Sequence, residues 1–102
     1  MTKLAVAEGT LEQSADEELA YQITTTNWVS NPTSPTVVAY DETLGETVTT
    51  TVFPTNSPTA SGDVITLSLL KSLTKGHTYR IEVKFTVSSN VYECFFRVQC
   101  PI

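Results

Sequence analysis

Apolar and polar residues alternate with a period of two along much of the chain, most clearly towards its C-terminal end. In residues 78–87 every odd position is apolar: Tyr79, Ile81, Val83, Phe85 and Val87. In residues 91–100 the apolar positions are even: Tyr92, Cys94, Phe96, Val98 and Cys100. Alternation of this kind is typical of strands with one buried face. The pattern therefore predicts two adjacent strands.

These two strands predict an antiparallel hairpin whose register follows from parity. Buried odd positions must face buried even positions, because a slip of one residue turns every side chain to the wrong face. A two-residue loop of Ser89 and Asn90 satisfies this rule, and Asn tolerates the positive φ of tight turns. The predicted pairs are Phe85 with Cys94, Val83 with Phe96, Ile81 with Val98, Tyr79 with Cys100, Glu82 with Arg97, and Lys84 with Phe95.

Earlier segments predict further short strands separated by turns. The expected strands are Leu19–Trp28 with a bulge near Thr24–Asn27, Thr36–Asp41, a weak one over Glu46–Phe53, and Asp63–Leu70 with Ile65, Leu67 and Leu69 on one face. The expected turns are Asn31–Pro35, Leu44-Gly45, the long loop Pro54–Gly62, and Lys75–His77. About seven short strands without a long helix predict an all-β, antiparallel β-sandwich.

The first 18 residues differ from the rest in charge. They hold five acids (Glu8, Glu12, Asp16, Glu17 and Glu18) against Lys3, which is most of the net charge of −5. We therefore divide the chain into an acidic N-terminal arm, residues 1–18, and a sandwich domain, residues 19–102. The arm is either solvated or a short leading strand.

Composition excludes several classes of function. An acidic chain without a basic block is a poor binder of nucleic acid, and no apolar run reaches the roughly 20 residues that span a membrane. Cys94 and Cys100 lie six residues apart, about 20 Å along one strand. A disulfide needs Cα atoms within about 7 Å, so we expect two buried thiols. The alternative is an intermolecular crosslink through Cys100.

The segment Leu73–Val83 resembles the L-x-x-G-x-x-Y-x-V-x-V run of immunoglobulin-like and fibronectin type III domains, with Leu73, Gly76 and Tyr79 at the key positions. The resemblance implies a core Leu, a Gly at the corner, and a tyrosine corner in which the Tyr79 hydroxyl bonds the backbone upstream. Trp28 in an early strand also fits such a core. The Cys…Trp…Cys pattern of antibody domains is absent.

A narrower resemblance covers roughly residues 19–100. Trp28, the run Asp63–Leu67, and the hairpin Leu73–Phe85 with Asn90–Val98 are similar to small immunoglobulin-like virion proteins of tailed bacteriophages. The resemblance implies a non-enzymatic capsid decoration protein in the virion, assembled in the host cytoplasm. It would bind the major capsid protein or other virion proteins as a homo-oligomer. The alternatives are a head–tail or tail accessory protein, a cell-surface adhesion or carbohydrate-binding module, and a small hydrolase.

Residues with potential chemistry predict neither a catalytic centre nor a cofactor or metal site. We expect His77 to be an exposed turn residue, because one His and two distant Cys cannot complete a zinc site. The carboxylate pairs Glu17-Glu18 and Asp41-Glu42 are expected to be solvated. A calcium site formed by Asp41, Glu42 and Glu46 is the alternative, although the usual ligand spacing is missing.

The candidate interface lies on the parity opposite the core. Phe95, Val91 and one of Val37 and Val38 fall there, beside Lys84. Exposed aromatic residues are enriched at protein interfaces, although the aliphatic part of Lys84 or another strand is the alternative cover for Phe95. The acidic arm, with Glu17 and Glu18, is the second candidate contact.

Overall fold

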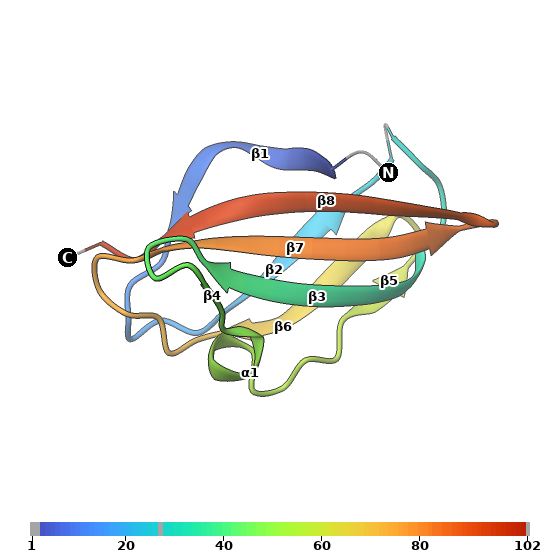
Figure 1. Cartoon of the computed structure of the whole chain (residues 1–102). Helices are drawn as coiled ribbons and strands as arrows, with labels where there is room; N and C mark the ends of the chain where they lie inside the picture. The colour runs from blue at the N-terminus through green and yellow to red at the C-terminus, as the bar shows by residue number, and fades with distance from the viewer. Residues whose placement is uncertain (1–2, 27, 102) are drawn as a thin grey trace.

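The computed structural model describes residues 3–26 and 28–101, which form eight strands and one short helix (Figure 1). The elements are β1 (Lys3–Glu12), β2 (Leu19–Thr24), β3 (Thr33–Asp41), β4 (Glu46–Thr47), α1 (Thr49–Val52), β5 (Thr59–Ser61), β6 (Val64–Leu70), β7 (Thr78–Val87) and β8 (Asn90–Gln99). Within these ranges no helix has the length and apolar character needed to span a membrane.

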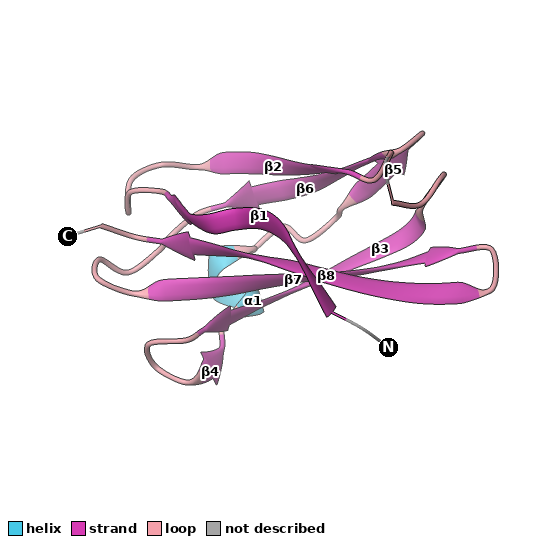
Figure 2. Ribbon diagram, turned by 90° about the horizontal axis from the view of Figure 1, so that it is seen from above, coloured by secondary structure: helices cyan, strands magenta, loops and turns pink. Residues whose placement is uncertain are grey.

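The strands form two sheets that pack face to face (Figure 2). The five-stranded sheet has the order β1-β8-β7-β3-β4, and the three-stranded sheet has the order β2-β6-β5. The orders β8-β7-β3 and β2-β6-β5 match strands G-F-C and B-E-D of an immunoglobulin-type sandwich. The predicted all-β sandwich is therefore confirmed, with one exception to antiparallel pairing, since β1 runs parallel to β8.

The N-terminal segment is a strand of the five-stranded sheet over most of its length. β1 pairs with β8 from Lys3 to Glu12, with a shift of register between Ala5 and Thr10. Of the two predicted alternatives, the structure contains the leading strand, and it is longer than expected. Residues 13–18 then cross to the other sheet through a turn in which the Ser14 amide donates to the Glu17 carboxylate at 2.8 Å.

The predicted hairpin register was wrong by two residues. β7 and β8 pair Val87 with Asn90 and Val83 with Cys94, so the loop is Ser88-Ser89. Ser88 has a φ of 55°, as the first central residue of a type II′ turn requires. Both loops satisfy the parity rule, and therefore parity could not choose between them. The observed register sets Lys84 opposite Glu93 instead of Phe95.

Two other strand predictions failed at irregularities. β2 ends at Thr24, so Trp28 lies in the following loop and not in a strand. The bulge lies instead where two residues of β6 face Tyr21 alone. An extra residue reverses the side-chain alternation beyond it. Leu70 is consequently buried, and Leu69, predicted to be in the core, is 46% exposed.

The middle of the chain holds less strand than predicted. Glu46–Phe53 forms a two-residue strand followed by one helical turn, α1. Thr49 explains part of this change, because its hydroxyl accepts a hydrogen bond from the Ala39 amide at 3.0 Å and draws the segment against β3. The expected long loop Pro54–Gly62 contains β5, which pairs with β6.

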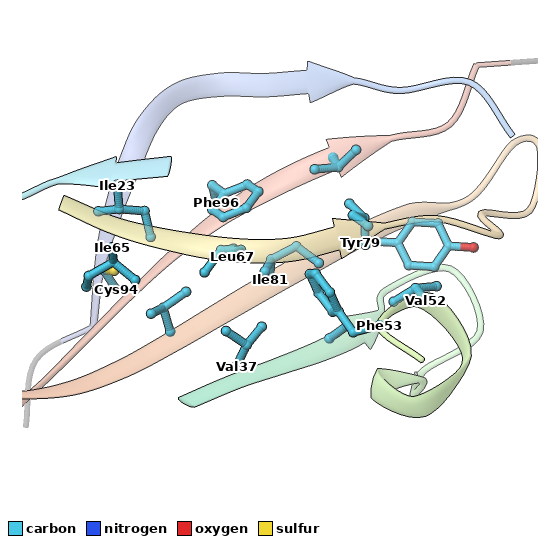
Figure 3. Close-up of a cluster of buried hydrophobic side chains, with 14 of the residues drawn as sticks. Ile23, Val37, Val52, Phe53, Ile65, Leu67, Tyr79, Ile81, Cys94 and Phe96 are labelled. Carbon is cyan, nitrogen blue, oxygen red and sulfur yellow. The ribbon is translucent and has the colours of Figure 1, made fainter. Parts of the chain in front are cut away.

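Buried side chains from both sheets fill the space between them (Figure 3). The five-stranded sheet supplies Val37, Ile81, Cys94 and Phe96 among others, and the three-stranded sheet supplies Ile23, Ile65 and Leu67. Val52 and Phe53, at the end of α1, cover one end of this core. Most of these residues lie at the predicted alternating positions.

The tyrosine corner is confirmed in its geometry. The Thr74 amide donates to the hydroxyl of the buried Tyr79 at 2.8 Å. Gly76 has a φ of 84°, which is the left-handed conformation that glycine adopts without steric cost. Leu73 is buried in the core. The segment Leu73–Tyr79 thus folds as its resemblance implied.

Candidate interaction surface

The outer face of the five-stranded sheet brings together most of the predicted interface residues. Its cross-strand rows follow from the register and place Phe95 beside Glu82 and Val38, and Arg97 beside Arg80 and Tyr40. The outward residues of the three central strands are Thr36, Val38 and Tyr40 of β3, Arg80, Glu82 and Lys84 of β7, and Val91, Glu93, Phe95 and Arg97 of β8.

Ion pairs fix the charged side chains of this face. Glu42 accepts from Arg80 through one carboxylate oxygen at 3.0 Å and from Arg97 through the other at 2.9 Å. Arg80 also donates to Glu82 at 2.9 Å. Two arginines directly opposite each other repel, and the shared Glu42 between them explains why this register is tolerated.

Both aromatic rings of the face lie under arginines. The Arg80 guanidinium is 4.9 Å from the centre of the Tyr40 ring, and that of Arg97 is 5.1 Å from the centre of the Phe95 ring. These distances are those of cation–π contacts. Phe95 is half-buried, and the group over its ring is Arg97, which the sequence analysis did not name as a cover. Lys84 instead approaches Glu93 at 3.7 Å.

Two valines remain open on the same face. Val38 is 43% exposed and Val91 is 42% exposed, whereas Val37 is buried. A shallow depression of about 160 Å³ lies beside Val38, lined also by Glu82, Lys84 and Glu93. Aromatic residues and arginine, which this face carries in Tyr40, Phe95, Arg80 and Arg97, are the residue types enriched at protein interfaces.

Glu17 and Glu18 lie elsewhere, on the loop between β1 and β2. Both are exposed, and Glu18 approaches Lys71 at 3.7 Å. The structure does not bring them to the outer face with Phe95, Val91 and Lys84. The five predicted interface residues therefore belong to two separate surfaces.

The loop carrying Glu17 is part of a strongly charged end of the sandwich. We name residues 12–18, 41–46 and 71–77 the acidic end, since the strand pairings bring these three segments to the same end of the sheets. It holds seven acids and two lysines, which equals the entire formal charge of −5. The other eight charged residues are four acids and four bases. The acid excess is thus a property of one end and not of the N-terminal segment alone.

Asp41 and His77 form a hydrogen-bonded pair at the acidic end that the sequence analysis missed. His77 Nδ1 lies 2.7 Å from an Asp41 carboxylate oxygen, and the side chains are 19% and 2% exposed. The other Asp41 oxygen accepts from the Thr43 and Leu44 amides, each at 3.0 Å. The predictions of an exposed His77 and a solvated Asp41 were wrong. A recognisable signal was Asp at the first position of a turn, where its side chain caps the following amides.

The carboxylates of Asp41 and Glu42 are bonded to other side chains of the protein. Asp41 bonds to His77, and Glu42 bonds to two arginines. Among the described residues, no group of three or more His, Cys, Asp or Glu side chains is placed to hold a metal ion. Glu42 therefore acts as a bridge between Arg80 and Arg97.

Both cysteines are free thiols in the interior. Cys94 and Cys100 are fully buried, which agrees with the prediction and contradicts a crosslink through Cys100 in the folded state. Burial raises the pKa of the Cys94 thiol to about 12. Burial also raises the pKa of Cys100, although Lys75 partly opposes this shift. Neither thiol is an activated nucleophile, because the thiolate is the reactive form.

A second surface depression lies on the opposite sheet. It has a volume of about 290 Å³ and is lined by Pro54, Thr55, Ser68, Leu69 and Lys71.

Comparisons with models of protein families, with curated proteins and with solved structures found no match to this chain.

Proposed function

We propose that the chain is a non-enzymatic structural protein of a tailed-bacteriophage virion, and most specifically a decoration protein that binds the outer capsid lattice. The proposal follows the resemblance to such proteins of Trp28, the run Asp63–Leu67, and the hairpin Leu73–Phe85 with Asn90–Val98. The observation that carries it is the outer face of the five-stranded sheet, where exposed Val38 and Val91 lie among ordered ion pairs. The partner is the major capsid protein or another virion protein.

Binding to a lattice needs no deep cavity and no strong single contact. Ordered side chains lose little further entropy when they bind, and the pairs of Glu42 with Arg80 and Arg97 supply such order. Repeated copies on a regular lattice add their contacts through a high effective concentration. A flat face with modest apolar area is suited to this mode of binding. A head–tail or tail accessory protein would use the same face.

A carbohydrate-binding module is the alternative that the surface disfavours. Sugar rings stack on open aromatic faces, and Tyr40 and Phe95 each already carry a guanidinium. Trp28 packs edge-on against Phe85 and Tyr92, with ring centres 5.3 and 5.8 Å apart. None of these rings forms a free platform.

Co-sedimentation tests the proposal. Heads and tails from the virion encoded in the same genome, each lacking this protein, are mixed separately with the purified chain. We expect the chain to pellet with heads, and Val38→Asp to abolish this binding. Leu69→Asp is the matched control, because Leu69 is 46% exposed against 43% for Val38 but lies on the other sheet. Pelleting with tails alone would favour the accessory role, and binding to neither overturns the proposal.

A further inference from the structure

The edge strands of the two sheets differ in how they are protected from further pairing. In the described part of the chain the edges are β1 and β4 of one sheet, and β2 and β5 of the other. β4 and β5 have only two and three residues, and β1 carries charged residues and an irregular register. Short length, charge and irregularity are devices that stop an edge from pairing with another chain. β2 has six residues and contains no charged residue, Pro or Gly.

The part of β3 that extends beyond β4 is also protected. β4 pairs with only the last two residues of β3. The Asn56 side chain donates to the Val37 carbonyl at 3.1 Å, and the Ala39 amide donates to the Thr49 hydroxyl at 3.0 Å. Pro35 has no N–H to offer. No comparable bond from a side chain to the backbone of β2 occurs within the described residues.

One hydrogen bond shows which backbone groups of β2 point away from β6. The Thr25 amide donates to the Asp63 carbonyl at 2.8 Å, in the register that β2 keeps from Gln22 onwards. Residues of an antiparallel pair alternate between those bonded to the partner strand and those whose N–H and C=O point to the other side. Thr25 and Ile23 therefore bond to β6, and the amides and carbonyls of Gln22 and Thr24 point to the free side. Both of these residues are exposed.

Two leucines that face the interior are left uncovered on the same side of the sandwich. Leu11 of β1 pairs with the buried Val98, and Leu19 of β2 pairs with the buried Leu70. Paired residues point to the same face of a sheet, yet Leu11 is 37% exposed and Leu19 is 36% exposed. β1 and β2 end their sheets on one side, because β3 and β5 are in contact on the other. A strand added beside β2 would cover these leucines.

We propose that the free side of β2 binds an extended segment of a partner polypeptide, which adds a strand to the three-stranded sheet. The backbone of the segment bonds to the amides and carbonyls of Gln22 and Thr24, as in other cases of strand addition. Alternate side chains of an added strand point inward, so these positions of the segment are apolar and cover Leu19 and Leu11. The remaining positions lie on the outer face, beside uncharged neighbours.

The occupant is a free segment and not β2 of a second copy. The inward residue Ile23 of a second copy is buried in its own core, so it has no surface left to cover Leu11 and Leu19. The free side of β2 is also separate from the outer face of the five-stranded sheet. The inference therefore does not depend on the proposed function.

Backbone hydrogen exchange with a synthetic peptide tests the proposal. The probe has the sequence of residues 78–87, which alternates apolar and polar positions. In the free chain we expect the Gln22 and Thr24 amides to exchange rapidly with water and the Ile23 amide to exchange slowly. Saturation with the peptide should slow exchange at Gln22 and Thr24 about tenfold or more, because their N–H groups become bonded. The same peptide with methylated backbone nitrogens keeps its side chains but loses its donors, and it should have no effect.

Two substitutions at Gln22 separate the backbone from the side chain. Gln22→Pro removes the N–H on the free side, and proline is tolerated at an edge position whose N–H is outside the ladder. Gln22→Ala is the matched control, since it loses the same side chain and its 3.3 Å bond to Thr66 but keeps the N–H. We expect Gln22→Pro to raise the dissociation constant of the peptide about tenfold or more, and Gln22→Ala to leave it nearly unchanged. Thr24→Pro provides a second variant should Gln22→Pro fail to fold.

Four results would overturn the inference. The first is slow exchange at Gln22 and Thr24 in the free chain, and the second is exchange that the peptide does not slow. The third is an equal effect of Gln22→Pro and Gln22→Ala on peptide binding. The fourth is a dimer in sedimentation equilibrium that Gln22→Pro dissociates, because a second copy would then occupy the edge. Binding to heads is tested with Val38→Asp, so failure of that proposal leaves these measurements unaffected.

Discussion

The two ends of the sandwich hold their loops in different ways. At the acidic end the linking groups are deeply buried: Gln13 is 0% exposed, Asp41 is 1% exposed and Tyr79 is 2% exposed. The opposite end is formed by residues 24–26, 28–34, 61–64 and 87–91, and we name it the serine-rich end. Its links run through Thr25, which is 0% exposed and bonds to the Asp63 carbonyl, through half-buried Trp28, and through backbone held in left-handed conformations. The first end has three buried side chains that link its segments, and the second has one, supported by turn geometry and ring packing.

This difference parallels the distribution of charge. Five of the seven acids at the acidic end are exposed, and repulsion among them disfavours the folded state there; these are Glu12, Asp16, Glu17, Glu18 and Glu46. Buried hydrogen bonds between the same segments oppose it: Gln13 links the β1–β2 loop to β6, and Asp41 links the β3–β4 turn to His77. The three connections of the serine-rich end hold one charged residue, Asp63, and they are linked by one fully buried side chain, Thr25. We therefore expect the free energy of unfolding to be more sensitive to substitutions at the acidic end.

Gln13→Leu is the substitution with the largest expected effect. The Gln13 amide nitrogen donates to the Leu70 and Glu17 carbonyls at 2.7 and 3.0 Å, and its oxygen accepts from the Tyr21 hydroxyl at 2.9 Å. Leucine leaves these partners unsatisfied, at a cost of about 2–4 kcal/mol in the free energy of unfolding. Urea denaturation measures it. Gln22→Leu, on the exposed face of β2, is the control, and equal losses for both would refute the role of Gln13.

Trp28→Ala tests the serine-rich end. The half-buried indole packs against Phe85 and Tyr92, so its removal should cost about 2 kcal/mol, below the value for a fully buried Trp. The same denaturation experiment measures it. A loss larger than that of Gln13→Leu would reverse the ranking of the two ends.

Tyr79→Phe isolates one hydrogen bond of the acidic end. The ring stays in the core, but the Thr74 amide loses its acceptor, and we expect a loss of about 1–2 kcal/mol. Tyr40→Phe is a matched control, because the phenylalanine ring keeps its place under Arg80 on the surface. Thermal unfolding of both variants beside the parent chain gives the difference, and equal transition temperatures would argue against a stabilising corner.

The buried Cys94 thiol, in the interior between the two ends, predicts that the free energy of unfolding falls at alkaline pH. Burial raises the pKa of Cys94 from 9.0 to about 12, so the thiol ionises in the unfolded chain before it does in the folded one. The free energy of unfolding is unaffected well below pH 9 and falls as the pH rises from about 9 towards 12, by roughly 1 kcal/mol at pH 10. Tyr21, whose pKa is raised by burial and by Glu17, adds to the same trend at higher pH. Cys94→Val should flatten the fall in the unfolding free energy above pH 9, and an unchanged slope would contradict this origin.

Sequence patterns predicted the sandwich because period-two alternation is strongest where one face is buried. Strands 78–87 and 90–99 and the corner from Leu73 to Tyr79 follow directly from that alternation and from a left-handed glycine. Parity was insufficient for the hairpin register, since Ser88-Ser89 and Ser89-Asn90 both satisfy it. The choice depends on contacts across the sheet, such as Lys84 with Glu93. Alternation also mispredicted which side chains are buried beyond the bulge in β6, where Leu70 instead of Leu69 faces the core.

The candidate surfaces were predictable only in part. Parity placed Val91, Phe95 and Lys84 on one outer face, and the register that brought Arg97 over Phe95 was not predictable from it. The loop that carries Glu17 and Glu18 lies at the same end of the sandwich as the turn at 41–46, because β1 and β3 both end at that end. This proximity is a result of topology. Pairing of Asp41 with His77 joins residues 36 positions apart, which no local pattern encodes.

The charge substitutions that compare the two ends directly have the smallest expected effect on the free energy of unfolding. Asp16→Lys at the acidic end should stabilise the fold by a few tenths of a kcal/mol at low salt, because Asp16 is exposed among like charges. The gain should vanish at high salt, where screening removes the repulsion. Ser61→Lys is the control at the serine-rich end, since Ser61 is equally classed as exposed but has only Asp63 as a charged neighbour along its connection. A salt-dependent gain of the same size at Ser61 would mean that repulsion is spread over the molecule. The acidic end would then differ from the serine-rich end in composition but not in energetics.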